Sequence, residues 1–156
     1  MTECSTELTL FPLSQKPVVV RADGGALTSD AGALLLREID ERLGLTRRLR
    51  GCLVDRRERG KVQHDLLSLL RQRLYQIALG YEDCDDADYL RGDPALKLAV
   101  GRAPLEADLA SQPTLSRLEN AVGWRECWRI SEALLGCYLQ RHLPAAVGVC
   151  IGRRRG

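Results

Sequence analysis

The stretch from His64 to Leu79 constrains the fold most, because its apolar residues recur with the period of an α-helix, about 3.6 residues. The apolar side chains of this stripe are Leu66, Leu67, Leu70, Leu74, Ile77 and Ala78. The polar side chains expected to face away from the core are Asp65, Ser68, Arg71, Gln72 and Gln76. Gly80 follows as the glycine that commonly ends a helix. The pattern predicts one long amphipathic helix.

Helical signals continue along most of the chain. The segment 28–30 offers N-cap oxygens to a helix in which Leu35, Leu36, Ile39 and Leu43 recur before Gly44 ends it. Further helices are predicted over residues 45–53, 83–90, 94–100, 111–122 and 124–142. The last of them carries a continuous stripe: Trp124, Cys127, Trp128, Ser131, Leu134, Leu135 and Tyr138.

The N-terminal residues differ from the rest, because short β-prone runs at 11–13 and 17–20 precede a turn at 23–25. The predicted fold is therefore mainly α, an irregular helical bundle with a short N-terminal β-strand or hairpin. The expected organisation is an extended lead-in at 1–21, a helical region at 22–143 and an aberrant tail at 144–156.

Length and composition fit one soluble domain, with 156 residues, 45% hydrophobic and 28% charged. The longest apolar runs, such as 33–36, are far too short to span a membrane, and the acidic N-terminus does not resemble a secretion signal. We therefore expect a cytoplasmic protein without a membrane partner.

Positive charge is concentrated in one segment, although the net charge is only +2. Between Arg47 and Lys61 there are seven basic residues and two acids. Arginine outnumbers lysine 20 to 3 in the chain, and its planar guanidinium suits phosphate oxygens. If four to six of these cations contact phosphates, log K for DNA falls with log salt at a slope of roughly −4 to −5. The alternative is a solvated face in which Asp55 and Glu58 are local partners.

The sequence gives only weak evidence for a metal-binding or catalytic site. The six cysteines (4, 52, 84, 127, 137 and 150) contain no Cys-x-x-Cys pair, which leaves them as structural or incidental thiols. The acidic residues at 82–88 lack the glycine and distal glutamate of a calcium loop, so we expect acids at a helix start. His64 has no adjacent nucleophile and is expected to be a cap or surface residue. Gly24-Gly25 lacks the ending of a phosphate-binding loop.

Four blocks in order, 26–38, 69–83, 90–102 and 109–120, resemble bacterial insertion-sequence transposases of the DDE type, insertion-sequence family 1380 (DDE transposase group 1). The resemblance covers about residues 20–143. In that family three carboxylates on a ribonuclease-H-like sheet hold two Mg²⁺ ions for cleavage and transfer of DNA strands. The first aspartate is expected shortly after the last helix.

The chain departs from the family there. Val149-Cys150-Ile151 resembles the start of the expected strand, but Gly152-Arg153-Arg154-Arg155 follows in place of carboxylates. Asp-Val-Asp-Gly written with the codons GAC-GTC-GAC-GGN reads as Gly-Arg-Arg-Arg when one extra G is placed in front, which suggests a frameshift or truncation that removes the catalytic sheet. No residue is therefore assigned as catalytic or metal-binding, and no cofactor is expected in this chain.

The sequence thus predicts an N-terminal transposase fragment without cleavage activity, limited to DNA binding or dimerisation. Its expected partners are transposon-end DNA, a second copy or an intact transposase, and DNA binding would associate it with the nucleoid. The residues predicted to contact phosphates are Arg47, Arg48, Arg50, Arg56, Arg57, Arg59, Lys61, Arg71 and Arg73. Two alternatives are a fragment that interferes with an intact transposase and a poorly folded remnant with exposed apolar stripes.

Overall fold

The computed structural model describes residues 7–13, 15–21 and 28–142. Within them the chain forms seven α-helices, one 3₁₀ helix and one two-stranded antiparallel sheet. The elements in chain order are β1 (Glu7–Leu13), β2 (Lys16–Arg21), α1 (Gly32–Leu43), α2 (Leu45–Cys52), η1 (Arg59–Lys61), α3 (Leu66–Ala78), α4 (Asp86–Leu90), α5 (Pro94–Val100), α6 (Gln112–Ala121) and α7 (Trp124–His142). The mainly α fold with an N-terminal hairpin is confirmed, and the described part contains no larger sheet.

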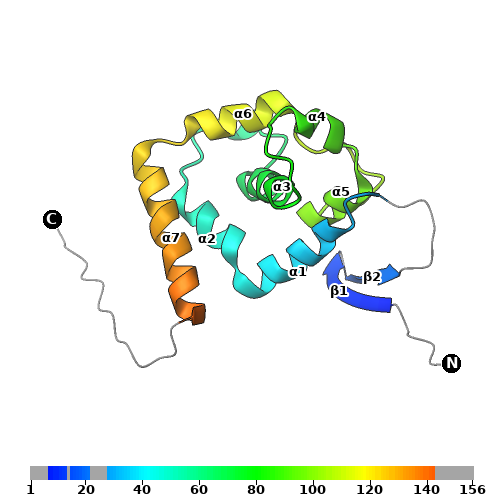
Figure 1. The fold of residues 1–156 in the computed structure, drawn as a ribbon. Coiled ribbons are helices and arrows are strands. Elements are labelled where there is room, and N and C mark those ends of the chain that lie inside the picture. Colours follow the sequence, from blue (N-terminus) through cyan, green and yellow to red (C-terminus); the bar gives the residue numbers. More distant parts are fainter. Residues whose placement is uncertain (1–6, 14, 22–27, 143–156) are drawn as a thin grey trace.

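Helix α3 lies in the middle of the molecule, where Figure 1 views it nearly end-on among the other helices. It contacts α1, α2, α5 and α6, so neighbours surround it on several sides. The sequence analysis expected the polar side chains of α3 to face away from the core. This prediction is wrong for Arg71, Gln72 and Gln76, which are all buried. The apolar residue Ile77 is 45% exposed instead. A helix enclosed by other helices has to bury part of its polar face as well.

The core is built where α1, α3 and α5 meet next to the hairpin. Phe11 reaches into it from β1, with the Arg37 guanidinium 5.2 Å from its ring centroid. The buried residues of this cluster are Phe11, Ala33, Leu34, Tyr75, Leu90, Leu96, Ala99, Val100 and Leu109. A second, smaller cluster joins α3, α4 and α6 through Leu69, Ala87, Ala110 and Leu115.

The helix ends predicted at Gly44 and Gly80 are confirmed, whereas the N-terminal caps of α1 and α3 differ from the prediction. Asp65 caps α3 by accepting from the backbone N–H groups of Leu67 and Ser68 at 2.9 and 3.0 Å. Gly80 has φ 98° after α3, where its left-handed conformation allows Tyr81 N–H to donate to the Gln76 carbonyl at 2.9 Å. The predicted cap of α1 is wrong, because the carboxylate of Asp30 accepts from the Tyr81 hydroxyl at 3.0 Å rather than from the helix.

Helix α7 lies at the edge of the molecule, alongside α2 (Figure 1). Its bounds match the predicted 124–142, but none of its residues is buried. None of the described helices combines the length and hydrophobicity needed to cross a membrane. The predicted turn at 23–25 and tail at 144–156 lie outside the described residues, so the division into three regions stays a prediction.

Candidate nucleic-acid interface

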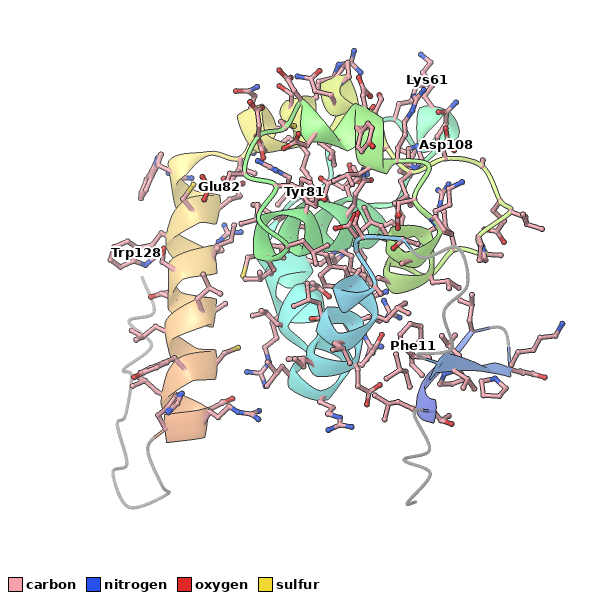
Figure 2. The ribbon with its side chains drawn as sticks, turned by 45° about the vertical axis from the view of Figure 1, so that its right-hand side comes forward. Phe11, Lys61, Tyr81, Glu82, Asp108 and Trp128 are labelled. Carbon is pink, nitrogen blue, oxygen red and sulfur yellow. The ribbon has the colours of Figure 1, made fainter. Side chains whose placement is uncertain are left out.

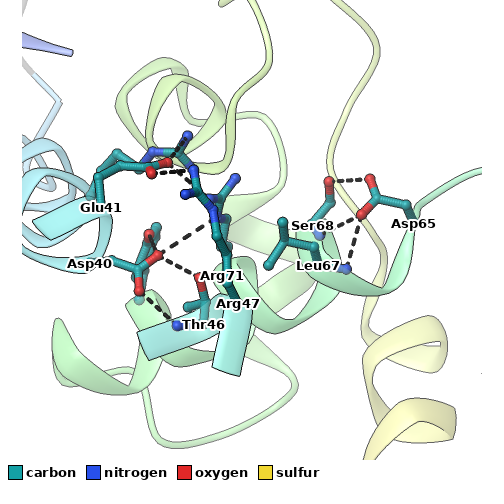
Figure 3. Close-up of polar contacts among 10 residues, drawn as sticks. Asp40, Glu41, Thr46, Arg47, Asp65, Leu67, Ser68 and Arg71 are labelled. Atoms are coloured by element: carbon teal, nitrogen blue, oxygen red, sulfur yellow. Dashed lines mark hydrogen bonds and ion pairs between the residues drawn. The ribbon is translucent and has the colours of Figure 1, made fainter. Parts of the chain in front are cut away.

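A buried polar network fixes α2, which carries the first part of the basic segment. The Asp40 carboxylate, at the end of α1, accepts from Thr46 N–H at 2.7 Å and from the Thr46 hydroxyl (Figure 3). It also accepts from the Tyr75 hydroxyl of α3 at 3.0 Å. Burial and the Asp40 carboxylate raise the pKa of Tyr75, so the phenol stays protonated. These bonds connect the N-terminus of α2 to both neighbouring helices.

Two of the predicted phosphate ligands belong to this interior. Arg71 donates to Glu41 at 2.9 Å and lies 3.7 Å from Asp40, and its side chain is 9% exposed. Burial lowers the pKa of Arg71, and the positive charge of Arg37 lowers it further. Arg73, 12% exposed, pairs with Glu119 and donates to the carbonyl of Glu82 at 2.7 Å. Both guanidiniums hold helices together and are directed away from solvent.

The loop after α2 is shaped by a two-bond arginine–carboxylate pair. Arg57 donates to the two Asp55 oxygens at 2.8 and 2.7 Å and to the His64 carbonyl at 3.0 Å. This contact lowers the pKa of Asp55 to about 2 and raises the pKa of Arg57. Arg57 therefore closes the loop on itself, and its charge is largely matched locally.

Five of the remaining predicted cations are on the surface. Lys61 lies 2.8 Å from Glu58 and Arg56 lies 3.7 Å from Glu126, and both basic side chains are more than three-quarters exposed. Arg50 is exposed and makes no ion pair with any residue that the structure describes. Arg47 pairs with Glu41 from the solvent side. Arg48 donates to Gln140 at 2.9 Å and so attaches α7 to α2. The Arg59 side chain lies outside the described part.

Two of these surface cations, Arg56 and Lys61, border a groove between residues 53–64 and α6, with a volume of about 570 Å³. Its floor is apolar and includes Leu53, Val62, Leu66 and Leu118. Arg56, Arg57 and Lys61 line one side, and Arg117 of α6 also lines it. The sequence analysis missed Arg117, because it is far from the basic segment along the chain and only the fold brings the two together.

His64 lies at the edge of the groove and is not a helix cap, since Asp65 has that role. Its Nδ1 is 2.9 Å from the guanidinium of Arg102. Burial lowers the pKa of His64, and the positive charges of Arg102 and Arg57 lower it further. The imidazole is therefore neutral at pH 7 and accepts a hydrogen bond from Arg102.

The described residues do not fit a two-metal centre. No three His, Cys, Asp or Glu side chains among them are placed to hold a metal ion. The buried carboxylate of Asp40 is already occupied by Thr46 and Tyr75. The acids at 82–88 are at a helix start, as predicted: Asp86 and Asp88 lie in the first turn of α4, and Asp88 accepts from Gln112 N–H at 3.0 Å. The four cysteines in the described part (52, 84, 127 and 137) are free thiols.

Comparisons with known proteins give one match. A sequence model of the family described as transposase DDE domain group 1 matches residues 11–150. No curated protein and no solved structure matches the chain.

Proposed function

The chain belongs to the transposase DDE domain group 1 family, and we propose that within it this chain binds transposon-end DNA without cutting it. The finer assignment to insertion-sequence family 1380 rests on the four sequence blocks at 26–38, 69–83, 90–102 and 109–120. A protein with this proposed role would act in the cytoplasm, associated with the nucleoid.

The observation that carries DNA binding is the exposed row of cations on α2 and the loop after it. Arg47, Arg50, Arg56 and Lys61 all present their charge to solvent. The carboxylates paired with Arg56 and Lys61 form exposed ion pairs, which contribute only about 0–1 kcal/mol each. A phosphate can replace such a carboxylate at little cost, whereas the Arg71 and Arg73 side chains are only 9% and 12% exposed and offer little charge to a phosphate in solution. The proposed contact set therefore excludes Arg71 and Arg73.

The carboxylates of this chain support the proposal that it does not cut DNA. When bound, two Mg²⁺ ions in this family's centre would activate the attacking oxygen and stabilise the leaving one. The described carboxylates cannot hold such a pair, and residues 143–156 contain no Asp or Glu. We therefore assign no cleavage step to this chain. The frameshift hypothesis for residues 152–155 stays a prediction.

The test compares two triple variants that each remove two arginines and one lysine. Arg50→Ala/Arg56→Ala/Lys61→Ala should weaken binding to end-containing duplex DNA by about 10- to 100-fold at low salt. The control, Lys16→Ala/Arg42→Ala/Arg91→Ala, removes exposed cations from β2, α1 and the end of α4 and should change affinity by about threefold or less. Equal losses of DNA affinity in both variants would mean that only net charge governs binding and that residues 47–61 are not a specific DNA-binding site.

Cleavage is tested separately with the same protein. Supercoiled plasmid carrying transposon ends should remain intact when incubated with the purified chain and Mg²⁺ or Mn²⁺. Metal-dependent nicking that copurifies with the protein would contradict the assignment.

A further inference from the structure

Helix α7 presents an apolar face that no described part of the molecule covers. Four of its large side chains are mostly exposed: Trp124 at 74%, Trp128 at 64%, Leu135 at 56% and Tyr138 at 60%. Figure 2 shows Trp128 pointing outward from α7, on the side opposite the other helices. Two exposed tryptophans on one helix are unusual for a surface that meets only water.

The spacing of this face is that of a coiled-coil seam. Residues 124, 128, 131, 135, 138 and 142 are separated alternately by four and three positions. The less exposed residues of α7, including Glu126, Ile130, Ala133 and Cys137, lie on the opposite side of the helix, toward α2. The seam is therefore directed away from the rest of the described molecule, where another helix can pair with it.

We propose that a second copy of this chain covers the seam, with the two α7 helices packed antiparallel in a two-fold dimer. The charges beside the seam favour a second copy as the partner and favour the antiparallel orientation of the two helices. Arg125 and Glu132 flank the seam on the same side, one heptad apart, and neither makes an ion pair with any described residue. A symmetric antiparallel pair brings Arg125 of each copy beside Glu132 of the other.

The same register gives complementary layers. Trp124 packs against Leu135 of the second copy, and Trp128 packs against the small Ser131. Ser131 donates its hydroxyl proton to the Cys127 carbonyl at 3.0 Å, which leaves its oxygen free to accept from the Trp128 indole N–H. Large side chains thus meet small or aliphatic ones, as a packed interface requires.

The competing arrangements lose these contacts. An antiparallel shift by one heptad places Glu132 beside Glu132 of the other copy, which is repulsive. In a parallel pair, Trp128 of one copy packs on Trp128 of the other. Arg125 of one copy then does not lie beside Glu132 of the other, so no ion pair forms between them. The overlap covers only about two heptads, so we expect a weak dimer with a Kd in the micromolar range.

The first experiment is sedimentation velocity of the intact chain, without DNA, over a range of concentrations up to hundreds of micromolar. The wild type should shift from monomer to dimer as concentration rises. Trp128→Glu should weaken the dimer by about 100-fold or more, because it buries a charge at the centre of the seam. The control Tyr89→Glu, an aromatic on α4 that is 88% exposed, should dimerise as the wild type does. A wild type that stays monomeric, or a Tyr89→Glu loss equal to that of Trp128→Glu, overturns the proposal.

The second experiment tests the register by charge reversal. Arg125→Glu and Glu132→Arg should each raise Kd by about 10-fold, because each creates two like-charge contacts per dimer. The double variant Arg125→Glu/Glu132→Arg should recover wild-type Kd, since the two residues are too far apart on one helix to pair within a chain. Single reversals without effect, or a double variant that remains weak, contradict antiparallel pairing. Thermal melts by circular dichroism show that each variant is folded.

Discussion

Two buried glutamines one turn apart on α3 differ in what their amides contact. The Gln72 amide donates to the Ala110 carbonyl at 2.8 Å and accepts from Ala110 N–H at 2.9 Å. It thereby supplies both hydrogen bonds that the backbone of Ala110, in the loop before α6, would otherwise need from another backbone segment. The Gln76 side chain is fully buried, and its amide has no hydrogen-bond partner within the described part. Gln72 therefore connects α3 to the loop before α6, whereas burial of the unpaired Gln76 amide costs desolvation free energy that no hydrogen bond offsets.

This contrast gives the first stability prediction. Gln72→Leu leaves both peptide groups of Ala110 unpaired and buried, and should lower the free energy of unfolding by about 2–4 kcal/mol. Gln76→Leu removes an unpaired amide of similar volume, and should change stability by at most about 1 kcal/mol, in the stabilising direction. Urea denaturation followed by circular dichroism measures both. Equal destabilisation by the two variants would show that volume, and not hydrogen bonding, governs the site.

Arg71 and Arg50 separate stability from DNA binding. Arg71→Met leaves Asp40 and Glu41 without their buried partner and should cost about 3 kcal/mol of stability. Arg50→Met changes an exposed side chain and should cost less than about 0.5 kcal/mol, while weakening DNA binding. Paired melts and DNA titrations of the folded variants check this. A folded Arg71→Met protein with greatly reduced DNA affinity would restore Arg71 to the contact set.

The lowered pKa of His64 predicts a pH dependence of stability. The unfolded chain takes up a proton near pH 6.5, whereas in the folded protein burial lowers the pKa of His64, and the positive charges of Arg102 and Arg57 lower it further. Stability is therefore fully present above pH 6.5 and decreases as pH falls from there through the folded pKa. His64→Gln should flatten the dependence of unfolding free energy on pH in this window. An unchanged slope in the variant would show that other groups are responsible.

At the level of elements, the sequence predicted most helices, because periodic apolar residues and terminal glycines act locally. It could not predict the surroundings of each helix. In α1 the regular leucines suggested a packed stripe, yet Leu35 and Ile39 are about half exposed, while Ala33 and Asp40 are buried. Burial of Asp40 depends on Thr46 and Tyr75, which only the fold brings together.

The candidate site shows the same division between local and long-range information. The clustering of charge at 47–61 is visible in the sequence, because it needs no tertiary structure. The sequence does not show which of these cations remain exposed. Arg71 and Arg73 are drawn to Glu41 and Glu119, and these partners lie on helices distant from them along the chain. Arg117 at the groove is missed for the same reason.

Helices α3 and α7 should differ widely in local stability. Six residues of α3 are buried, whereas α7 has none and is attached mainly through α2. In dilute solution the amide protons of α7 should exchange through local opening, faster than those of α3 by a factor of about 100 or more. Hydrogen exchange with mass spectrometry measures this. Equal protection of α7 and α3 at low concentration would show that α7 unfolds only with the whole domain.

At the scale of the whole molecule, the two proposed surfaces serve different purposes. The loop cations Arg56 and Lys61 line the groove and are exposed to solvent, while Trp128 of the seam points outward from α7, on the side opposite the other helices (Figure 2). A dimer through α7 would thus carry two copies of the basic segment and could contact DNA at two places. Family membership fits such a role in transposition.

The most direct measurement is the salt dependence of DNA binding, followed by fluorescence anisotropy with a labelled duplex. Release of counterions by Arg47, Arg50, Arg56 and Lys61 predicts a slope of log K against log salt of about −3 to −4. Arg50→Ala/Arg56→Ala/Lys61→Ala should reduce the magnitude of this slope by about 3, and the control triple should leave it within about 1 of the wild-type value. A slope near zero for the wild type, or one that the first triple variant does not change, would contradict DNA binding by this segment.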